Sequence, residues 1–481
     1  RSSPVTGVQT CALPIYRIES DSIGEMKVNA AVYYGVQTQR AIENFDISRI
    51  KVSDYPELVR ALGMVKLAAA RANYDLGLLP KDLFKAIEAA CKRVIAGEFN
   101  DQFPVDMIQG GAGTSTNMNA NEVIANIALE SLGKEKGDYK TLSPNDHVNC
   151  SQSTNDSYPT ALKIAFINSN KELVKHLQGL IDAFHRKGAE FASILKMGRT
   201  EMQDAVPMTL GQEFEAFAAN LTEEVERLNQ MARFFQEINM GATAIGTGIN
   251  AAPGYAELVT SKLSAIVGMD FIKATNLIEA TPDTGSYVIY SSALKRLAVK
   301  LSKISNDLRL LSSGPRCGFN EINLPALQPG SSIMPGKVNP VVPEMVNEVC
   351  YKVIGNDLTV TMASEAGQLQ LNAMEPVIAE AILESITYLQ RAMDTLVDKC
   401  VDGITANEDV CHNLVMNSIG LVTALNPYIG YKNSAMIAKE ALKTGKGVYE
   451  LVLEHNILPK EKLDEILDPE NMIAPHPYVN K

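Results

Sequence analysis

The sequence contains no tryptophan, and aromatic residues make up only 6% of it. Aliphatic side chains and methionine supply the apolar content instead, which is typical of closely packed helices. No apolar run approaches the ~18 residues of a membrane-spanning helix, so we expect no membrane span. Basic runs are also absent and the net charge is −12, which argues against nucleic acid as a partner. An anionic substrate would therefore need a site that is locally positive.

Cysteine is scarce and scattered, with seven residues at positions 11, 91, 150, 317, 350, 400 and 411. The odd number and the wide spacing fit neither a disulfide framework nor a CxxC metal site. Reduced thiols in a cytoplasmic protein are the better interpretation. Cys411 and His412 are adjacent, but no further ligand pair lies close to them in the sequence, so we expect no metal site.

The first residues, RSSPVTGVQTCALPI, fit nothing that follows them. They lack the apolar core of 7–15 residues that a secretory signal needs. The string is similar to a translated sequencing adapter. We therefore expect residues 1–16 to be a non-native leader and leave them out of the fold argument.

Helical periodicity dominates the chain from about residue 160 onward. In segment 171–195, leucine and phenylalanine follow one stripe, and in segment 214–238 apolar residues alternate at spacings of three and four. These stripes are Leu173, Leu177, Leu180, Phe184, Phe191 and Ile194, and Phe214, Ala218, Leu221, Val225, Leu228, Ala232 and Phe235. A third helical segment runs from about Pro343 past Cys400, with bends expected at Gly355 and Pro376, and a fourth covers 290–311.

The pattern predicts an all-α fold of three domains. We expect an N-terminal domain over 17–153, a central bundle of long helices over 154–408 and a small C-terminal helical domain over 409–481. Helices this long expose more apolar surface than one bundle can cover, so we expect them to assemble into an oligomer. The only strands that we expect are a short hairpin within 26–35.

Polar and turn residues replace the helical pattern in four stretches. GGAGTSTNMNANE (110–122) places glycines and hydroxyls ahead of a helix, where free N–H groups and the positive end of the helix dipole suit a carboxylate. A plain helix cap explains that stretch equally well. In 143–159, the run Ser153–Asp156 has more small polar residues than a cap needs. His147 in the same stretch is more readily explained as a structural residue.

The third stretch, GRTEMQDAVP (198–207), interrupts two helical segments, and its simplest reading is a helix–helix turn with solvated charges. The fourth is GSSIMPGKVNP (330–340), whose glycines and prolines suit a mobile lid better than a rigid connection. The glycine-rich stretch 241–250 has no predicted strand before it and no Lys-Ser/Thr after it, so we interpret it as a loop, not a phosphate site.

Together these stretches supply hydroxyls, amides and one lysine, but almost no candidate catalytic histidine. That set suits binding of a small dicarboxylate and stabilisation of extra negative charge on it. It does not suit a Ser-His-Asp hydrolase, which needs an orienting histidine and acid.

The fourth stretch resembles the signature G-S-S-x-M-P-x-K-x-N of the aspartase/fumarase superfamily, and it matches at every fixed position. The resemblance extends from about Arg17 to near the C-terminus and includes GAGTSTNMNANEV and NDHVNCSQSTNDSYPT. Within the superfamily, the chain is more similar to the enzymes that deaminate aspartate. The segments that carry this similarity are LLSSGPRCGFNEINLP, PVVPEMVNEVCYKVIGND and EAGQLQLNAMEPV. Fumarases usually differ after the lysine loop, and they tend to have histidine at the position of Ser143.

The resemblance implies reversible deamination of L-aspartate to fumarate by a cytoplasmic homotetramer, with sites drawn from three subunits and a multi-helix core. It implies no required cofactor and leaves activation by Mg²⁺ open. Ser331 matches the base that takes the Cβ proton. The residues that match substrate contacts are Thr114, Ser153, Thr154, Asn155, Thr200, Ser332, Lys337 and Asn339. Fumarate hydration is the alternative activity, and a non-catalytic structural protein is a third possibility.

One position departs from the family pattern. Many members have histidine after the threonine that matches Thr200, paired with the glutamate that matches Glu344. This chain has Glu201 there, and a carboxylate cannot act as an imidazole. Two close carboxylates also disfavour double ionisation. We expect Glu201 to be partly protonated, or held by Arg199 or by the ammonium group of the substrate.

Overall fold

The computed structural model describes residues 15–473, and nearly all regular structure in that range is helical. The sheets there are four two-stranded pairs, so the predicted all-α class is confirmed. The chain divides into two compact units. Unit 1 runs to Lys171 and includes Leu228–Leu294 and Gly355–Ile386, whereas unit 2 comprises Glu172–Arg227, Lys295–Ile354 and the chain from Thr387 onward. The domain boundaries near 153 and 409 stay predictions.

Unit 1 begins with a hairpin and a group of shorter helices. Strand β1 (Tyr16–Ser20) pairs antiparallel with β2 (Glu25–Asn29). This hairpin lies earlier in the chain than predicted, because only its second strand overlaps 26–35. Most of the expected leader lies outside the described residues, while Tyr16 pairs with Asn29. The following elements are α1 (Val36–Asn44), η1 (Val52–Asp54), α2 (Pro56–Asp75), α3 (Lys81–Ile95), η2 (Asn100–Gln102), α4 (Thr114–Ser131) and the π-turn η3 (Pro144–Val148).

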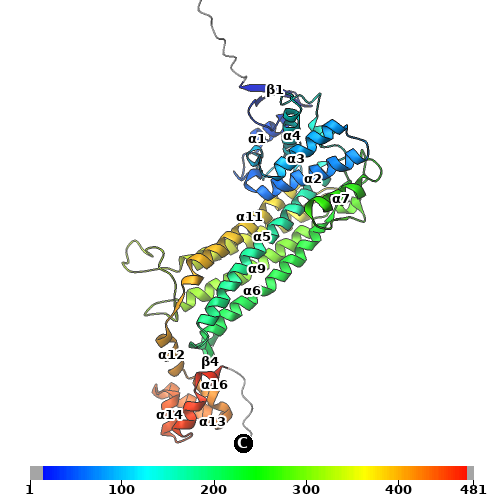
Figure 1. Ribbon diagram of the computed structural model, residues 1–481. Helices are drawn as coiled ribbons and strands as arrows, with labels where there is room; N and C mark the ends of the chain where they lie inside the picture. Colours follow the sequence, from blue (N-terminus) through cyan, green and yellow to red (C-terminus); the bar gives the residue numbers. More distant parts are fainter. Residues whose placement is uncertain (1–14, 474–481) are drawn as a thin grey trace, which may run out of the picture. The chain divides into compact units, whose positions relative to one another are not determined.

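Five long helices run through the two units, and the two predicted stripes lie on the first two of them and the residues that directly follow each. The five helices are α5 (Thr154–Glu190), α6 (Leu210–Ala232), α9 (Gly285–Leu311), α10 (Val341–Glu365) and α11 (Glu375–Lys399). The residues of both stripes are buried except Val225, which is partly exposed. Figure 1 shows α5, α6, α9 and α11 as long rods lying side by side.

Polar contacts join these helices within each unit. In unit 1, the Asn170 amide of α5 donates to Asn229 of α6 and accepts from the Tyr290 hydroxyl of α9. In unit 2, Asn347 of α10 donates to Ser302 of α9. The amides thus satisfy each other's hydrogen-bonding groups inside an otherwise apolar interface.

The third helical segment is not continuous, which corrects the prediction. Helix α10 stays helical through Gly355 and ends at Glu365, and α11 begins at Glu375. Asn372 lies in the break between them: its side chain donates to the carbonyls of Ala363 and Ser364 and accepts from Met374 N. This amide satisfies carbonyls that the end of a helix leaves without partners.

The stretch predicted as a helix–helix turn is a second hairpin, which is also a correction. Strand β3 (Leu195–Thr200) pairs antiparallel with β4 (Gln203–Thr209). Smaller elements complete the chain: η4 (Arg233–Gln236), β5 (Glu237–Ile238), α7 (Tyr255–Val267), β6 (Ile272–Lys273), α8 (Leu277–Ala280), β7 (Ile322–Asn323), η5 (Val401–Gly403) and β8 (Thr405–Ala406).

The C-terminal helices form a small core within unit 2. They are α12 (Glu408–Met416), α13 (Leu421–Thr444, kinked at Gly430), α14 (Val448–Glu454), α15 (Lys460–Ile466) and α16 (Pro469–Met472). Leu195 and Met197 of β3 are buried in the same core, so the hairpin is packed onto these helices. The predicted break at PHPYVNK lies outside the described residues. In residues 15–473, no helix is both long and apolar enough to cross a bilayer.

Candidate active site

A glycine-rich turn sets the start of α4 and presents Thr114. Gly111, Ala112 and Gly113 all have positive φ, at 91°, 54° and 87°. A Cβ at Gly113 would lie 2.4 Å from the Tyr158 ring of α5, so only glycine fits there. Thr114 is the first residue of α4 and is exposed, and its hydroxyl donates to Gly111 O at 2.8 Å. The turn therefore packs the beginning of α4 directly onto α5.

The run Ser153–Asp156 starts α5 through a capping box. The Ser153 hydroxyl accepts from Asn155 N at 3.2 Å, and the Asp156 carboxylate accepts from Ser153 N at 2.9 Å. Two residues of the run thus form the cap. Thr154 and Asn155 make other contacts: Thr154 Oγ1 accepts from Asn117, and Asn155 Nδ2 donates to Ala244 O at 2.7 Å.

Asn117 of α4 joins the starts of the two helices. Its Nδ2 donates to Thr154 Oγ1 at 3.1 Å, and its Oδ1 accepts from Ser157 Oγ at 3.0 Å. The N-terminal ends of α4 and α5 are therefore held close together. Each end carries the partial positive charge of a helix N-terminus, so the pair suits an anionic ligand.

A buried lysine supports this junction. Lys66 of α2 is fully buried and donates from Nζ to the side-chain oxygens of Asn117, Asn149 and Gln152, at 2.7, 3.1 and 2.9 Å. Burial lowers the pKa of Lys66 to about 7, and the charge of Asp156 opposes that change. The three bonds use all three donors of an ammonium group, which fits the protonated lysine.

Asp156 connects the same junction to the glycine-rich stretch 241–250. Its Oδ2 accepts from Gly241 N and Thr243 N, at 3.1 and 3.0 Å. Burial raises the pKa of Asp156 to about 6 although these bonds favour the ionised form. The short strand β5 precedes this stretch, which corrects the prediction that none does. Backbone N–H groups of the glycine-rich stretch thus bind the Asp156 carboxylate of the same chain.

The serine loop 330–340 folds back on itself ahead of α10. Gly330 N donates to Lys337 O at 2.7 Å, and Asn339 Nδ2 donates to Gly330 O at 2.9 Å. Lys337 Nζ contacts Asn339 Oδ1 at 2.5 Å. The loop therefore brings Lys337 and Asn339 next to Gly330, the residue before the two serines.

Ser331 occupies a distinctive position in this loop. Its Oγ accepts hydrogen bonds from Ile333 N and Met334 N, at 3.2 and 3.1 Å. Two backbone donors aimed at one oxygen stabilise negative charge on it. Ser332 and Lys337 are exposed, and Ser331 and Asn339 are partly exposed.

Thr200 and Glu201 lie at the tip of the β3–β4 hairpin. Thr200 pairs with Gln203, and Glu201 and Met202 form the turn with φ of 53° and 62°. Both site residues are exposed. Arg199 forms its ion pair with Glu321 at 2.7 Å, and no ion pair between Arg199 and Glu201 occurs in residues 15–473. Glu344 lies in the first turn of α10.

The predicted site residues thus fall into two groups. Thr114, Ser153, Thr154 and Asn155 belong to unit 1, at the N-terminal ends of α4 and α5, which Asn117 joins through Thr154. The second group belongs to unit 2 and lies on the hairpin tip, in the serine loop and at the start of α10. His147 has a structural contact, because its Nδ1 accepts from Ser143 N at 2.8 Å.

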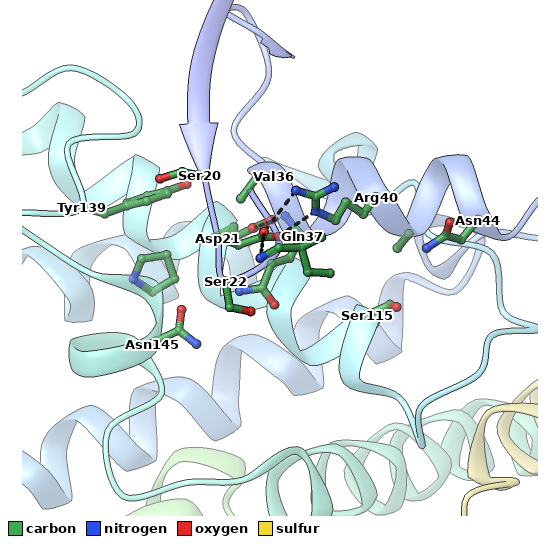
Figure 2. Close-up of a pocket in the computed structure, with 14 residues that line it drawn as sticks. Ser20, Asp21, Ser22, Val36, Gln37, Arg40, Asn44, Ser115, Tyr139 and Asn145 are labelled. Atoms are coloured by element: carbon green, nitrogen blue, oxygen red, sulfur yellow. Dashed lines mark hydrogen bonds and ion pairs between the residues drawn. The ribbon is translucent and has the colours of Figure 1, made fainter. Parts of the chain in front are cut away.

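A polar cavity of about 520 Å³ in unit 1 was not anticipated. Figure 2 shows Arg40 of α1 directed at Asp21, with which it forms an ion pair at 2.8 Å. Ser115 and Asn145 also line the cavity, but none of the predicted site residues does. Part of its lining belongs to the polar stretches 110–122 and 143–159, but the lining residues from 20–23 and α1 carry no such signal. Groups of three or more metal-ligating side chains do not occur in the described range.

Comparison with known proteins identifies the family. A family model described as "Lyase" matches residues 24–355, and one described as "Fumarase C C-terminus" matches residues 421–474. The aspartate ammonia-lyase of Pseudomonas aeruginosa is 62% identical over 460 residues, covering 95% of this chain and 97% of that protein. The chain belongs to the aspartase/fumarase superfamily. The predicted membership is therefore confirmed.

Other relatives agree with this membership. The aspartate ammonia-lyase of Helicobacter pylori strain 26695 is 59% identical, with 96% of this chain and 99% of that protein covered. A cobalt-bound fumarate lyase:delta crystallin structure from Brucella melitensis superposes with a TM-score of 0.93 at 57% identity, covering 96% of this chain and all of that one. A class II fumarase of Schistosoma mansoni has a TM-score of 0.89 at 37% identity, with the same coverage. The aspartate ammonia-lyases are thus closer in sequence than this fumarase.

Proposed function

We propose that this chain deaminates L-aspartate reversibly to fumarate and ammonia. The observation that carries the proposal is the geometry of Ser331, whose Oγ accepts two backbone N–H groups within the family signature loop. An ordinary serine is a poor base, and donors that stabilise its oxyanion make it a better one. The high identity to aspartate ammonia-lyases over nearly the whole chain supports the same activity.

In the proposed reaction, the Ser331 oxyanion takes a proton from Cβ of aspartate. The C–H electron pair moves into the β-carboxylate and gives an enediolate with two negative charges. Collapse of this intermediate forms the Cα–Cβ double bond and expels ammonia from Cα. Since the extra charge exists only near the transition state, donors fixed before the reaction accelerate it.

The remaining residues bind the substrate in this proposal. Ser332 helps hold the β-carboxylate, and Lys337 and Asn339 grip the α-carboxylate. The other group consists of Thr114, Ser153, Thr154, Asn155 and Thr200, which donate to the carboxylates or surround the amino group. The two convergent helix starts at Thr114 and Thr154 support an anionic ligand.

Glu201 takes the place of the family histidine at the hairpin tip, and we propose that it faces the substrate ammonium. Arg199 already pairs with Glu321, which favours this role over capture of Glu201 by Arg199. Glu344 is proposed as a supporting residue at the start of α10. The serine loop is proposed to close over bound substrate as a lid.

We propose that the reaction needs no cofactor, because hydroxyls, amides and one ammonium group suffice to bind and activate a dicarboxylate. Exhaustive dialysis against EDTA should leave turnover at neutral pH within twofold of the untreated enzyme. Activation by added Mg²⁺ is a separate effect, which titration of Mg²⁺ into the dialysed enzyme would reveal. A tenfold loss on dialysis would contradict the proposal.

We further propose a cytoplasmic homotetramer with sites shared between subunits. The six cysteines within the described range are free thiols, which supports a reducing compartment. Apolar side chains on an exposed face of α10 support assembly through the long helices.

The test follows fumarate absorbance with purified protein. L-aspartate should give a signal and L-malate should not. Ser331→Ala should lower kcat by at least ~10³-fold with little change in substrate binding, because only the proton transfer is lost. A signal with malate alone would favour fumarate hydration, and a signal with neither would favour a structural protein. Near-normal kcat in Ser331→Ala would exclude Ser331 as the base.

A further inference from the structure

A buried carboxylate lies next to the hairpin that carries Thr200. Glu321, the residue before β7, is fully buried in unit 2. Its Oε1 lies 2.7 Å from Arg199 NH1 and its Oε2 lies 3.0 Å from Lys196 Nζ. Neither oxygen has a hydrogen bond of good geometry, so charge attraction dominates both contacts. A buried ion group of this kind rarely adds net stability, which makes a positioning role worth testing.

The β3–β4 pairing is irregular beside this double contact. Lys196 and Arg199 are three residues apart, so a regular strand would place them on opposite faces. The pairing register shifts between Met197 and Arg199, where two steps along β3 face three along β4. Both side chains nevertheless reach Glu321, so β3 departs from regular alternation here. Gly198 sits at the shift, and a Cβ there would come within 2.8 Å of Val206 O.

Arg199 is fixed from several sides at the base of the turn. Its guanidinium lies 4.1 Å from the centre of the Phe319 ring, and its NH1 donates to Met197 O at 3.3 Å. It is the neighbour of Thr200, the last paired residue of β3. The direction in which Thr200 and Glu201 project is therefore set by where Arg199 is held.

We propose that Glu321 is a positioning residue for catalysis. Through Arg199, and with Lys196 as its second partner, it fixes the β3–β4 turn so that Thr200 and Glu201 meet the dicarboxylate in the productive orientation. This inference rests on the proposed function, in which the hairpin tip contacts the substrate. Glu321 acts only through Arg199 and Lys196 and touches no reacting atom.

The test compares Glu321→Gln with a matched control, Glu224→Gln. Glu224 of α6 is also fully buried in unit 2 and also faces two cations, with Lys300 Nζ at 2.6 Å and Arg296 NH2 at 3.1 Å. Its oxygens likewise lack hydrogen bonds of good geometry, but it lies on a long helix, not beside the hairpin. The two substitutions therefore remove the same charge from equivalent environments.

Both variants should lower Tm by similar amounts. Only Glu321→Gln should raise KM for L-aspartate, by at least tenfold, while its kcat falls less than threefold. Amide hydrogen exchange of the peptide spanning 199–203 should speed up at least tenfold in Glu321→Gln and stay unchanged in Glu224→Gln. Equal KM values in the two variants, or unchanged exchange at the hairpin, would overturn the proposal.

A second variant covers the case in which Glu321→Gln does not fold. Arg199→Gln keeps the Lys196–Glu321 pair but removes the charge through which Glu321 holds the turn, together with the guanidinium over Phe319. It should show the same rise in KM and the same faster exchange, and a variant indistinguishable from wild type would also refute the role of Glu321. If wild-type protein does not convert aspartate, the proposed function fails, whereas the exchange measurement still decides whether Glu321 holds the hairpin.

Discussion

Asn117 illustrates how one amide can position a proposed substrate contact, Thr154. It joins Lys66, Thr154 and Ser157 inside unit 1. Asn117→Ala should lower stability by about 1–3 kcal/mol, because Lys66 loses an acceptor. It should also raise KM for aspartate roughly tenfold, since Thr154 and the start of α5 lose their link to α4. Steady-state kinetics and thermal melts of the purified variant provide the measurement.

Asn126 offers a control on the same helix. It is equally buried, and its Nδ2 donates to Tyr33 O and to the Tyr139 hydroxyl. Asn126→Ala should lower Tm by a similar amount and leave KM unchanged. If both variants shift KM alike, the effect of Asn117 is one of general stability and not of substrate binding.

Glu375 makes stability depend on pH. It is buried at the start of α11, and burial raises its pKa to about 8, while the charge of Lys163 partly offsets this. Because the folded pKa exceeds the unfolded value of 4.5, the folded state binds the proton more tightly. Its contribution to stability is therefore complete below about pH 4.5 and is lost as pH rises towards 8.

Glu375→Gln should remove this dependence. The Tm of the wild type minus that of the variant should fall as pH rises from 5 to 8. The corresponding difference in the free energy of unfolding should fall by a few kcal/mol, at about 1.4 kcal/mol per pKa unit. Parallel Tm curves for the two proteins across this range would show that Glu375 keeps an ordinary pKa.

At the scale of elements, the start of α4 depends on one glycine. Gly113 combines a φ of 87° with a close approach to Tyr158. Gly113→Ala should destabilise the protein by about 2–5 kcal/mol, because left-handed strain adds to overpacking. Activity should fall as well, since Thr114 and the α4 terminus must move away from α5. Chemical denaturation and fumarate production measure the two effects.

The other end of α4 provides the matched variant. Gly133 has a φ of 68°, but no atom lies within 4 Å of a Cβ built there. Gly133→Ala should cost only the backbone strain, about 1–2 kcal/mol, and leave turnover intact. The prediction for Gly113 fails if the two alanine variants are equally stable.

The sequence predicts elements whose stability is local and misses those set by distant contacts. The stripe from Leu173 to Phe184 repeats over several turns, so α5 could be predicted from periodicity. The β3–β4 hairpin could not, because Leu195 and Met197 pack on helices more than 200 residues later in the chain. Gly367 and Asn372 weakly indicate the break after Glu365. The helical periodicity of the segment was the stronger pattern, and it predicted one continuous helix.

The same distinction holds for the site. The serine loop carries its motif in eleven consecutive residues, so its members could be named from the sequence. Glu321 and Asn117 carry no motif, because their importance comes from partners brought close by folding. The protonation and the binding role of Glu201 also depend on which groups lie close to it after folding, and the sequence does not identify those groups.

At the scale of the whole molecule, α10 presents an apolar face that residues 15–473 leave exposed. Tyr351, Leu358 and Met362 are spaced along one side of the helix and are all exposed. Gly355 lies on the same side, and no atom approaches the position of its Cβ. Large apolar groups around a glycine suit a second helix at close range, as expected in a tetramer core.

Leu358→Asp should therefore dissociate the assembly, because it would bury an unpaired charge in the interface. Light scattering after size-exclusion chromatography should give a smaller mass than that of the wild type.

Leu442→Asp is the control, since Leu442 is 73% exposed on α13 and Leu358 61% exposed on α10. That variant should keep the wild-type mass and turnover. Aspartate turnover in Leu358→Asp should fall together with mass, because each site in the proposed assembly draws residues from several subunits. A fully active monomer would refute the shared site. An unchanged mass would exclude this face of α10 from the interface.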